Sequence, residues 1–320
     1  MLAFCLIALP AHAQASRTWV SGVGNDADPC SRTAPCKTFA GAISKTAVNG
    51  EINCLDPGGF GAVTITKSIT IDCHEIFASI LNSSVNGVVI AFDSFGVGDT
   101  RKTVRLRNVN FNGFNTGLSG IKILGGASSA GSAGSAVFIE DCLIDGNFGS
   151  PGRGISDERI GGGKLSISHT TVRDMGATGI AVAPASGSTT INAVLDNVRV
   201  QNANFGVAAG NGVRMMITNS VFSGNTSAGI EDDPGAQINV DNNVTSNNGT
   251  GVQTGGTTRL ANTDISFNGT GISGAGSTLS FGNNRISGNT TAGTAPTAIG
   301  AASSTFGQQY GPAKQPGSSS

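Results

Sequence analysis

Apolar residues recur along this chain at fixed offsets, in short runs broken by Asn and Gly. When the sequence is aligned with itself, two columns of equivalent positions are apolar almost throughout. The first column reads Phe111, Ile144, Val172, Val200, Phe222, Thr245, Ile265 and Ile286. The second column, which precedes it in each repeat, reads Leu106, Ile139, Ile167, Leu195, Ile217, Val240, Leu260 and Phe281. Repeats of roughly 20–30 residues are typical of solenoids, so we expect both columns to point into a shared interior.

A polar column lies between the two apolar ones, and six of its members are asparagine: Asn108, Asn197, Asn219, Asn242, Asn262 and Asn283. Asp141 and His169 hold the same place in two earlier repeats. Asparagine tolerates left-handed backbone and its amide both donates and accepts, so it suits a tight turn made once per repeat. We therefore expect one asparagine corner per coil, with the amides hydrogen-bonded into a ladder along the solenoid.

The runs between corners are short, β-branched and punctuated by Gly, and they lack the dense leucine pattern of leucine-rich repeats. This pattern predicts an all-β parallel β-helix over residues 51–300, with about nine or ten coils at one strand spacing per coil. Before it, residues 14–50 are expected to form an extension and a short capping helix. Thr38 would be the N-cap of that helix, and Phe39, Ala42, Ile43 and Ala47 would share its apolar face.

The two ends of the chain have the composition of processing and tail segments. The run "MLAFCLIALPAHAQ" ends in the small-residue pattern of a cleavage site, so we expect residues 1–13 to be a signal peptide. It could be truncated at its start, because the positively charged segment that usually begins such a peptide is missing. Residues 301–320 are rich in Ser, Gly and Pro and are expected to form a flexible tail. We expect a secreted, periplasmic or cell-surface protein with no transmembrane segment in the mature chain. How the C-terminal end of the solenoid is covered stays open, and association of copies through that end is one alternative.

The cysteines fit an oxidising compartment. We expect the disulfides Cys30–Cys36 and Cys54–Cys73, and we expect Cys142 to be a buried free thiol. The charge of the chain is scarce and balanced, at 12% charged residues and a formal net charge of −1. This balance argues against a nucleic-acid partner, because such partners require a concentrated positive charge.

The N-terminal segment resembles that of a known class. The stretch "RTWVSGVGNDADPCSRTAPCKTFAGAI", followed by "GGFGAVTITKSITI", is similar to the start of secreted right-handed parallel β-helix proteins of the pectate-lyase-like superfamily. The resemblance implies a right-handed solenoid whose first coils follow a capping helix. It does not imply one activity, because the superfamily includes lyases, hydrolases, esterases, phage tailspikes and adhesins.

Charged residues cluster in the repeats that carry the longest insertions. The catalytic candidates there are Asp145, Arg153, Asp157, Arg173 and Asp174. Carboxylates in a facing pair would serve a glycoside hydrolase, and an arginine could act as the base of a lyase. The alternative, which we favour, is that "SPGRGISDERIGGG" is a solvated loop whose charges serve solubility.

Two further groups could bind ligands. Arg105 and Arg107 alternate with inward residues, so both are expected on an outer face where an acidic glycan could bind. A calcium site could be formed by Glu231, Asp232 and Asp233, and the competing interpretation is a polar turn. We expect that the protein requires no cofactor.

We expect an exported, non-catalytic scaffold or glycan-binding protein whose partner is a polysaccharide or cell-surface glycan. The alternative is a polysaccharide lyase or glycoside hydrolase acting on an acidic polysaccharide.

Overall fold

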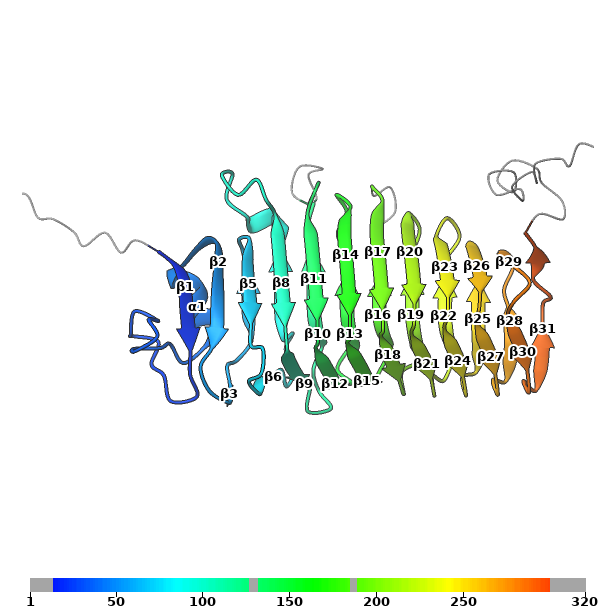
Figure 1. Ribbon diagram of the computed structural model, residues 1–320, viewed down its shortest axis with the longest axis horizontal. Coiled ribbons are helices and arrows are strands. Elements are labelled where there is room, and N and C mark those ends of the chain that lie inside the picture. The colour runs from blue at the N-terminus through cyan, green and yellow to red at the C-terminus, as the bar shows by residue number, and fades with distance from the viewer. Residues whose placement is uncertain (1–13, 127–131, 185–188, 300–320) are drawn as a thin grey trace, which may run out of the picture.

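The computed structural model describes residues 14–126, 132–184 and 189–299, which form a rod of stacked coils (Figure 1). Each regular coil contributes one strand to each of three sheets, and neighbouring strands within every sheet are parallel. The chain therefore confirms the predicted all-β parallel β-helix. The signal-peptide and tail predictions, for residues 1–13 and 301–320, lie outside the described residues. Among the residues described, no helix is long and apolar enough to cross a membrane.

The three sheets are named here A, B and C. Sheet A comprises β1 (Ala15–Val20), β2 (Thr46–Cys54), β5 (Ile69–Asp72), β8 (Thr103–Arg107), β11 (Ala136–Glu140), β14 (Gly163–Ser168), β17 (Ile191–Asp196), β20 (Val213–Thr218), β23 (Gln237–Asp241), β26 (Thr257–Ala261), β29 (Ser277–Ser280) and β32 (Thr297–Ala298). Sheet B comprises β3 (Gly58–Gly59), β6 (Ala78–Leu81), β9 (Val109–Asn112), β12 (Leu143–Asn147), β15 (Thr171–Met175), β18 (Arg199–Gln201), β21 (Val221–Ser223), β24 (Val244–Ser246), β27 (Asp264–Ser266) and β30 (Arg285–Ser287). Sheet C comprises β4 (Val63–Ile65), β7 (Val88–Ala91), β10 (Ser119–Leu124), β13 (Arg153–Asp157), β16 (Thr178–Val182), β19 (Phe205–Ala209), β22 (Ala228–Asp232), β25 (Thr250–Thr254), β28 (Thr270–Ser273) and β31 (Thr291–Gly293).

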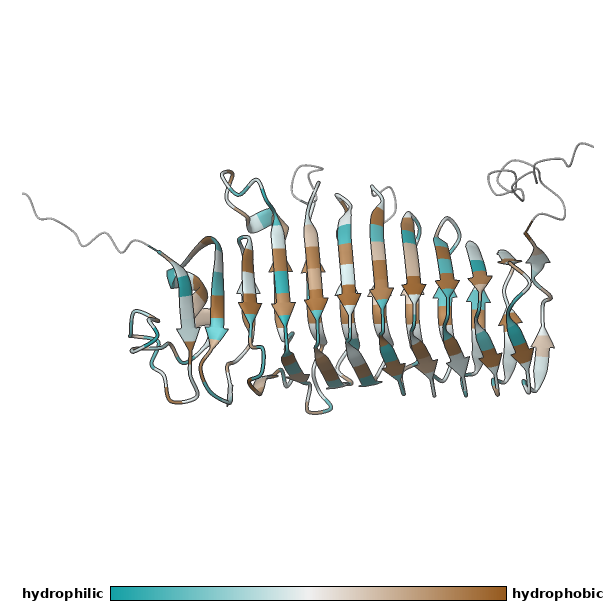
Figure 2. Ribbon diagram, viewed as in Figure 1, coloured by the Kyte–Doolittle hydropathy of each residue, from teal (hydrophilic) through white to brown (hydrophobic). Residues whose placement is uncertain are grey.

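The predicted inward columns form the core. Every member of the column through Phe222 faces its neighbour in register on sheet B, from Phe111 to Ile286. Thr245, the polar exception, is fully buried, and its hydroxyl donates to the Gly251 carbonyl at 2.9 Å. Figure 2 shows the resulting alternation of hydrophobic and hydrophilic residues along the strands of sheet A. Successive residues of a strand point to opposite faces, so half of each strand is left for the surface.

The second column is confirmed from Leu106 to Leu260, but Phe281 was assigned to it wrongly. In the last repeat Ser280 pairs with Leu260, and Phe281 is 60% exposed. A shift of one residue in register moves a side chain to the opposite face of a strand, which accounts for the error.

The asparagine corners are confirmed in their backbone. The residues with left-handed φ between sheets A and B include Asn108, Asp141, His169, Asn197, Asn219, Asn242 and Asn262, whereas Asn283 is not among them. Their amides are joined only locally: Asn242 donates to Asn219 at 2.7 Å, and Asn283 donates to Asn262 at 2.7 Å. These corners are largely exposed.

A second, buried ladder runs between sheets B and C and was not predicted. The side-chain amide of Asn225 donates to Asn248 at 2.8 Å, Asn248 donates to Asn268 at 3.0 Å, and Asn268 donates to Asn289 at 2.9 Å. The same carbonyl oxygens also accept from the backbone N–H of the preceding coil's asparagine. Each buried amide is thus satisfied by the next coil, which fixes how the coils stack.

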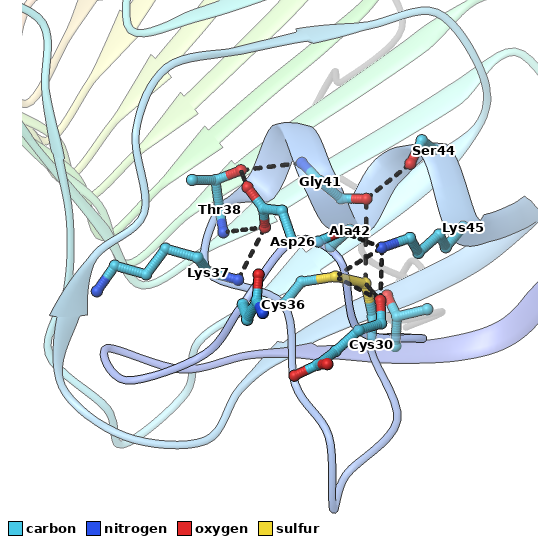
Figure 3. Close-up of a disulfide and its surroundings, with 12 residues drawn as sticks. Asp26, Cys30, Cys36, Lys37, Thr38, Gly41, Ala42, Ser44 and Lys45 are labelled. Atoms are coloured by element: carbon cyan, nitrogen blue, oxygen red, sulfur yellow. Dashed lines mark hydrogen bonds between the residues drawn. A yellow bond between two sulfur atoms is a disulfide. The ribbon is translucent and has the colours of Figure 1, made fainter.

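The N-terminal end is covered by α1 (Phe39–Lys45), with Thr38 as its N-cap at 2.9 Å from the Gly41 N–H (Figure 3). Phe39 and Ala42 are buried, and the Phe39 ring packs against Phe60. Ala47 does not belong to the helix as predicted, because the backbone becomes extended at Thr46 and continues as β2.

Two disulfides join the segments around this cap, Cys30–Cys36 and Cys54–Cys73, as predicted. Cys142 is a buried free cysteine, and burial raises the pKa of its thiol to about 12.

At the opposite end of the described chain, the strands β31 and β32 are exposed throughout.

Candidate functional site

The structure does not bring the five catalytic candidates together. Asp145 and Arg173 lie on neighbouring strands of sheet B and form an ion pair, with 2.9 Å between Arg173 Nη2 and Asp145 Oδ2. Asp174 follows at the corner, in a left-handed conformation, and accepts from Asn202 at 3.2 Å. Arg153 begins a strand of sheet C and pairs there with Glu158 at 3.3 Å. The structure therefore brings Asp145 and Arg173 together and places Arg153 on another sheet.

Asp157 is not on the surface, and the interpretation of its segment as a solvated loop is also wrong. Residues 153–157 are β13, and Asp157 and Arg159 are both fully buried. Asp157 Oδ2 lies 2.6 Å from Arg159 Nη2, and Oδ1 lies 2.9 Å from Arg159 Nε. Arg159 also donates to Ser135 Oγ at 2.7 Å and to the Lys164 carbonyl at 3.1 Å. Since every oxygen of Asp157 is engaged and excluded from water, this pair joins coils and offers nothing to a substrate.

A hollow on the outer face of sheet B lies beside Asp145. It measures about 250 Å³ and is lined by Phe77, Ser79, Leu81, Asn110, Phe111, Asn112, Leu143 and Asp145. Phe77 and Leu81 are 62% and 60% exposed, so the lining includes exposed apolar side chains as well as Asp145, which is paired with Arg173.

The acidic residues at the end of β22 do not all face the same way. Asp232 points inward, where it accepts from Thr258 Oγ1 at 3.2 Å and from the Gly256 N–H at 3.1 Å. Glu231 points outward, and desolvation together with the charges of Asp233 and Asp232 raises its pKa to about 7. Desolvation also raises the pKa of Asp232, to about 6. In the part of the chain that is described, no group of three or more His, Cys, Asp or Glu side chains is placed to hold a metal ion.

Arg105 and Arg107 lie on the outer face of sheet A, as predicted, but their charges are compensated. Arg107 forms ion pairs with Glu140 and with Asp72, and the Arg105 guanidinium lies 3.6 Å from Glu140 and over the Phe138 ring. Hydrogen bonding to Glu140 raises the pKa of Arg107. An anionic ligand would have to compete with these carboxylates.

The later coils of sheet A carry cations that are not compensated. Lys164 on β14 and Arg214 on β20 are exposed, and among the described residues neither side chain has a hydrogen-bond or ion-pair partner. Asn192 of β17 lies between them in register, and Gln237 of β23 follows Arg214. The same row of strands faces the viewer in Figure 1. We call the four residues Lys164, Asn192, Arg214 and Gln237 the cation–amide column.

A hollow of about 300 Å³ lies against this column. It is lined by Asn192, Ala193, Val194, Arg214, Met215, Met216, Gln237 and Asn239. Val194 is 46% exposed and, with Met216, gives the hollow an apolar floor. Beyond it, Arg259 of β26 lies 3.4 Å from the side-chain oxygens of Gln237 and Asn239, so its charge also faces neutral groups.

The cation–amide column was missed at the level of sequence, although a signal for it exists. Its members lie three residues before Ile167, Leu195, Ile217 and Val240, which the apolar pattern had already aligned. Comparing the outward positions in that alignment would have placed two cations and two amides in one column. It would also have placed Glu140 beside Arg107.

Comparison with known proteins agrees with this architecture. Residues 153–306 match a family described as a right handed beta helix region. A GH136 lacto-N-biosidase from Eubacterium ramulus is similar over 88% of this chain and 67% of its own, at 10% sequence identity and a TM-score of 0.54. Pectate lyase Pel9A is similar over 92% of this chain and 82% of its own, at 16% identity and a TM-score of 0.52. No curated protein matches the chain in sequence.

The chain is thus a right-handed parallel β-helix with the fold of the pectate-lyase-like proteins. At these identities the likeness defines the fold alone, and an activity has to be argued from the side chains of this chain.

Proposed function

We propose that this protein is an exported, non-catalytic β-helix that binds an acidic polysaccharide along the outer face of sheet A. The observation that carries the proposal is the alignment of Lys164 and Arg214, two exposed cations without partners among the described residues, two strands apart on one flat face. An uncompensated cation gains more from an anionic ligand than one already paired with a carboxylate, because no protein ion pair has to be broken.

The surroundings of the two cations suit a sugar chain. Asn192, Gln237 and Asn239 supply amides that donate to and accept from hydroxyl groups. Val194 and Met216 offer apolar contact for the C–H face of a sugar ring. The parallel strands present these groups as a continuous row, so an extended polymer can cross several coils at once (Figure 1).

The geometry of the catalytic candidates favours binding over turnover. Arg173 is held by Asp145 through both Nε and Nη2, and Asp157 is enclosed with Arg159. A glycosidase needs two carboxyl groups across one bond, about 5–10 Å apart. Among the five candidates, Asp145 lines the hollow on the outer face of sheet B.

A polysaccharide lyase or hydrolase at the Asp145–Arg173 pair is the second candidate function, and the hollow beside Asp145 favours it. In that case Arg173→Ala would abolish turnover and leave thermal unfolding nearly unchanged.

Export is supported by the two disulfides, which are typical of oxidising compartments.

The test is to measure binding and turnover on the same polysaccharides. Purified protein is incubated with anionic and neutral polysaccharides, and binding is followed by affinity electrophoresis while new reducing ends and unsaturated uronate are assayed. We expect retardation by anionic polymers, none by neutral polymers, and no products. Product formation that is lost in Arg173→Ala would replace this proposal with the enzymatic one.

A further inference from the structure

We infer that the polymer bound by the cation–amide column carries its anionic group on every second sugar, in an alternating acidic and neutral disaccharide repeat. This inference rests on the proposed function, since it names the class of polysaccharide for the same face. The column reads cation, amide, cation, amide on four consecutive strands: Lys164, Asn192, Arg214 and Gln237.

The argument begins with spacing. Adjacent strands of a sheet lie about 4.8 Å apart, which is close to the length of one sugar residue in an extended polysaccharide. Lys164 and Arg214 are two strands apart, so their Cα atoms are separated by about 9.6 Å. A chain that crosses the strands therefore places one sugar over each strand. Acidic sugars would fall over β14 and β20, and a neutral sugar over β17. The position over β23 presents the Gln237 amide, whose oxygen lies 3.4 Å from the Arg259 guanidinium.

The groups over β17 fit a neutral sugar. Asn192 can donate to and accept from an acetamido or hydroxyl group, and Val194, two residues along the same strand, gives the hollow an apolar wall that suits a methyl group. A uronate whose carboxylate faced the protein at this place would meet an amide and an isopropyl group with no cation in register. The hollow thus matches an N-acetylated hexosamine better than a second uronate.

The experiment compares oligosaccharides of equal length by calorimetry. The probes are hexasaccharides of hyaluronan and of unsulfated chondroitin, which alternate, and a hexagalacturonate, which carries twice as many carboxylates. Charge attraction alone favours the hexagalacturonate. The alternating template predicts that the hyaluronan or chondroitin hexasaccharide binds about tenfold more tightly, a difference of about 1.4 kcal/mol.

Asn192→Lys is the informative variant, because it places cations on three consecutive strands. Asn192 is exposed, so we expect the variant to keep the fold. The ratio of the affinities for the hexagalacturonate and the alternating hexasaccharides is expected to shift at least about fivefold toward the hexagalacturonate. Tighter binding of the hexagalacturonate by the unmodified protein, still weakened in Arg214→Gln, would overturn the alternating repeat and leave the proposed function standing. Binding of neither kind of anionic probe would overturn both.

Discussion

The carboxylate of Asp157 and the guanidinium of Arg159 form a fully buried ion pair with two hydrogen bonds, at 2.6 and 2.9 Å. Arg159 extends from this pair to Ser135 in the preceding turn, to the carbonyl of Lys164 on β14 and toward the Phe92 ring. The pair therefore joins sheet C to the strand that carries the first cation of the proposed binding column.

Removing the arginine of this pair should be strongly destabilising. Arg159→Met leaves Asp157 as an unpaired buried charge, for which we expect a loss of about 3–5 kcal/mol in the free energy of unfolding. The measurement is urea unfolding followed by circular dichroism. Arg153→Met is the matched control, because its pair with Glu158 is partly exposed and should contribute less than about 1 kcal/mol. Equal effects of the two substitutions would contradict the assignment.

The buried amide ladder should matter more than the exposed corners. Asn248 donates to Asn268, to Thr245 Oγ1 and to the Phe222 carbonyl, and its own carbonyl accepts from Asn225. Asn248→Ala leaves several buried hydrogen-bonding groups without partners. We expect a loss of about 1–3 kcal/mol in the free energy of unfolding for each group that stays unsatisfied. We expect a lower thermal midpoint and faster proteolysis.

The control for the ladder is Asn242→Gly, which keeps the left-handed corner and removes one exposed amide bond, so the expected loss is below about 1 kcal/mol. If Asn242→Gly proved as damaging as Asn248→Ala, the exposed corners would be the principal ladder, as the sequence had suggested.

Stability should fall as pH rises through neutrality because of Glu231. Its pKa is raised to about 7 in the folded protein from an ordinary value of 4.5, so the folded state holds the proton more tightly. Stability from this proton is fully present below about pH 4.5 and is lost as pH rises through about 7. Asp232, with its pKa raised to about 6, acts in the same direction at lower pH.

The corresponding variant is Glu231→Gln, which cannot ionise. Between pH 5 and 8, roughly, the unmodified protein should lose on the order of 1–2 kcal/mol, and Glu231→Gln should lose clearly less. The free energy of unfolding is measured at each pH, with Glu75→Gln, an exposed glutamate near the N-terminal end, as the control. A pH slope unchanged in Glu231→Gln would show that another group is responsible.

Much of the fold was predictable because a β-helix repeats its physical requirements. Ile217 and Val240 must return to the same interior place in successive coils, and this produces the aligned apolar columns. Phe281 shows the limit: in the last repeat six residues instead of five separate the inward residue of sheet A, Ser280, from that of sheet B, Ile286, and hydrophobicity alone does not reveal this shift. The prediction that Ala47 belongs to the helix was also wrong, because the helix ends at Lys45 and the chain pairs with β1 from Thr46 onward.

The candidate site was less predictable because the sequence does not show which charged side chains are buried, which are paired and which are free on the surface. Asp157 stands in a Gly-rich polar stretch that is typical of loops, yet the strand pairing of β13 carries it inside. Arg107 looked available, but its partners Glu140 and Asp72 are supplied by the neighbouring coils. Whether a charge is compensated depends on residues in the next coil, and that requires the register of the outward columns as well as the inward ones.

The most direct measurement for the central claim is the affinity of Arg214→Gln for an anionic polysaccharide, with Arg199→Gln as its matched control. Arg199 is also exposed and without a partner among the described residues, but it lies on sheet B. Loss of one charge-assisted contact should weaken binding about tenfold in Arg214→Gln, and Arg199→Gln should bind as the unmodified protein does. Equal affinities of all three proteins, or a larger loss in Arg199→Gln, would contradict binding along sheet A.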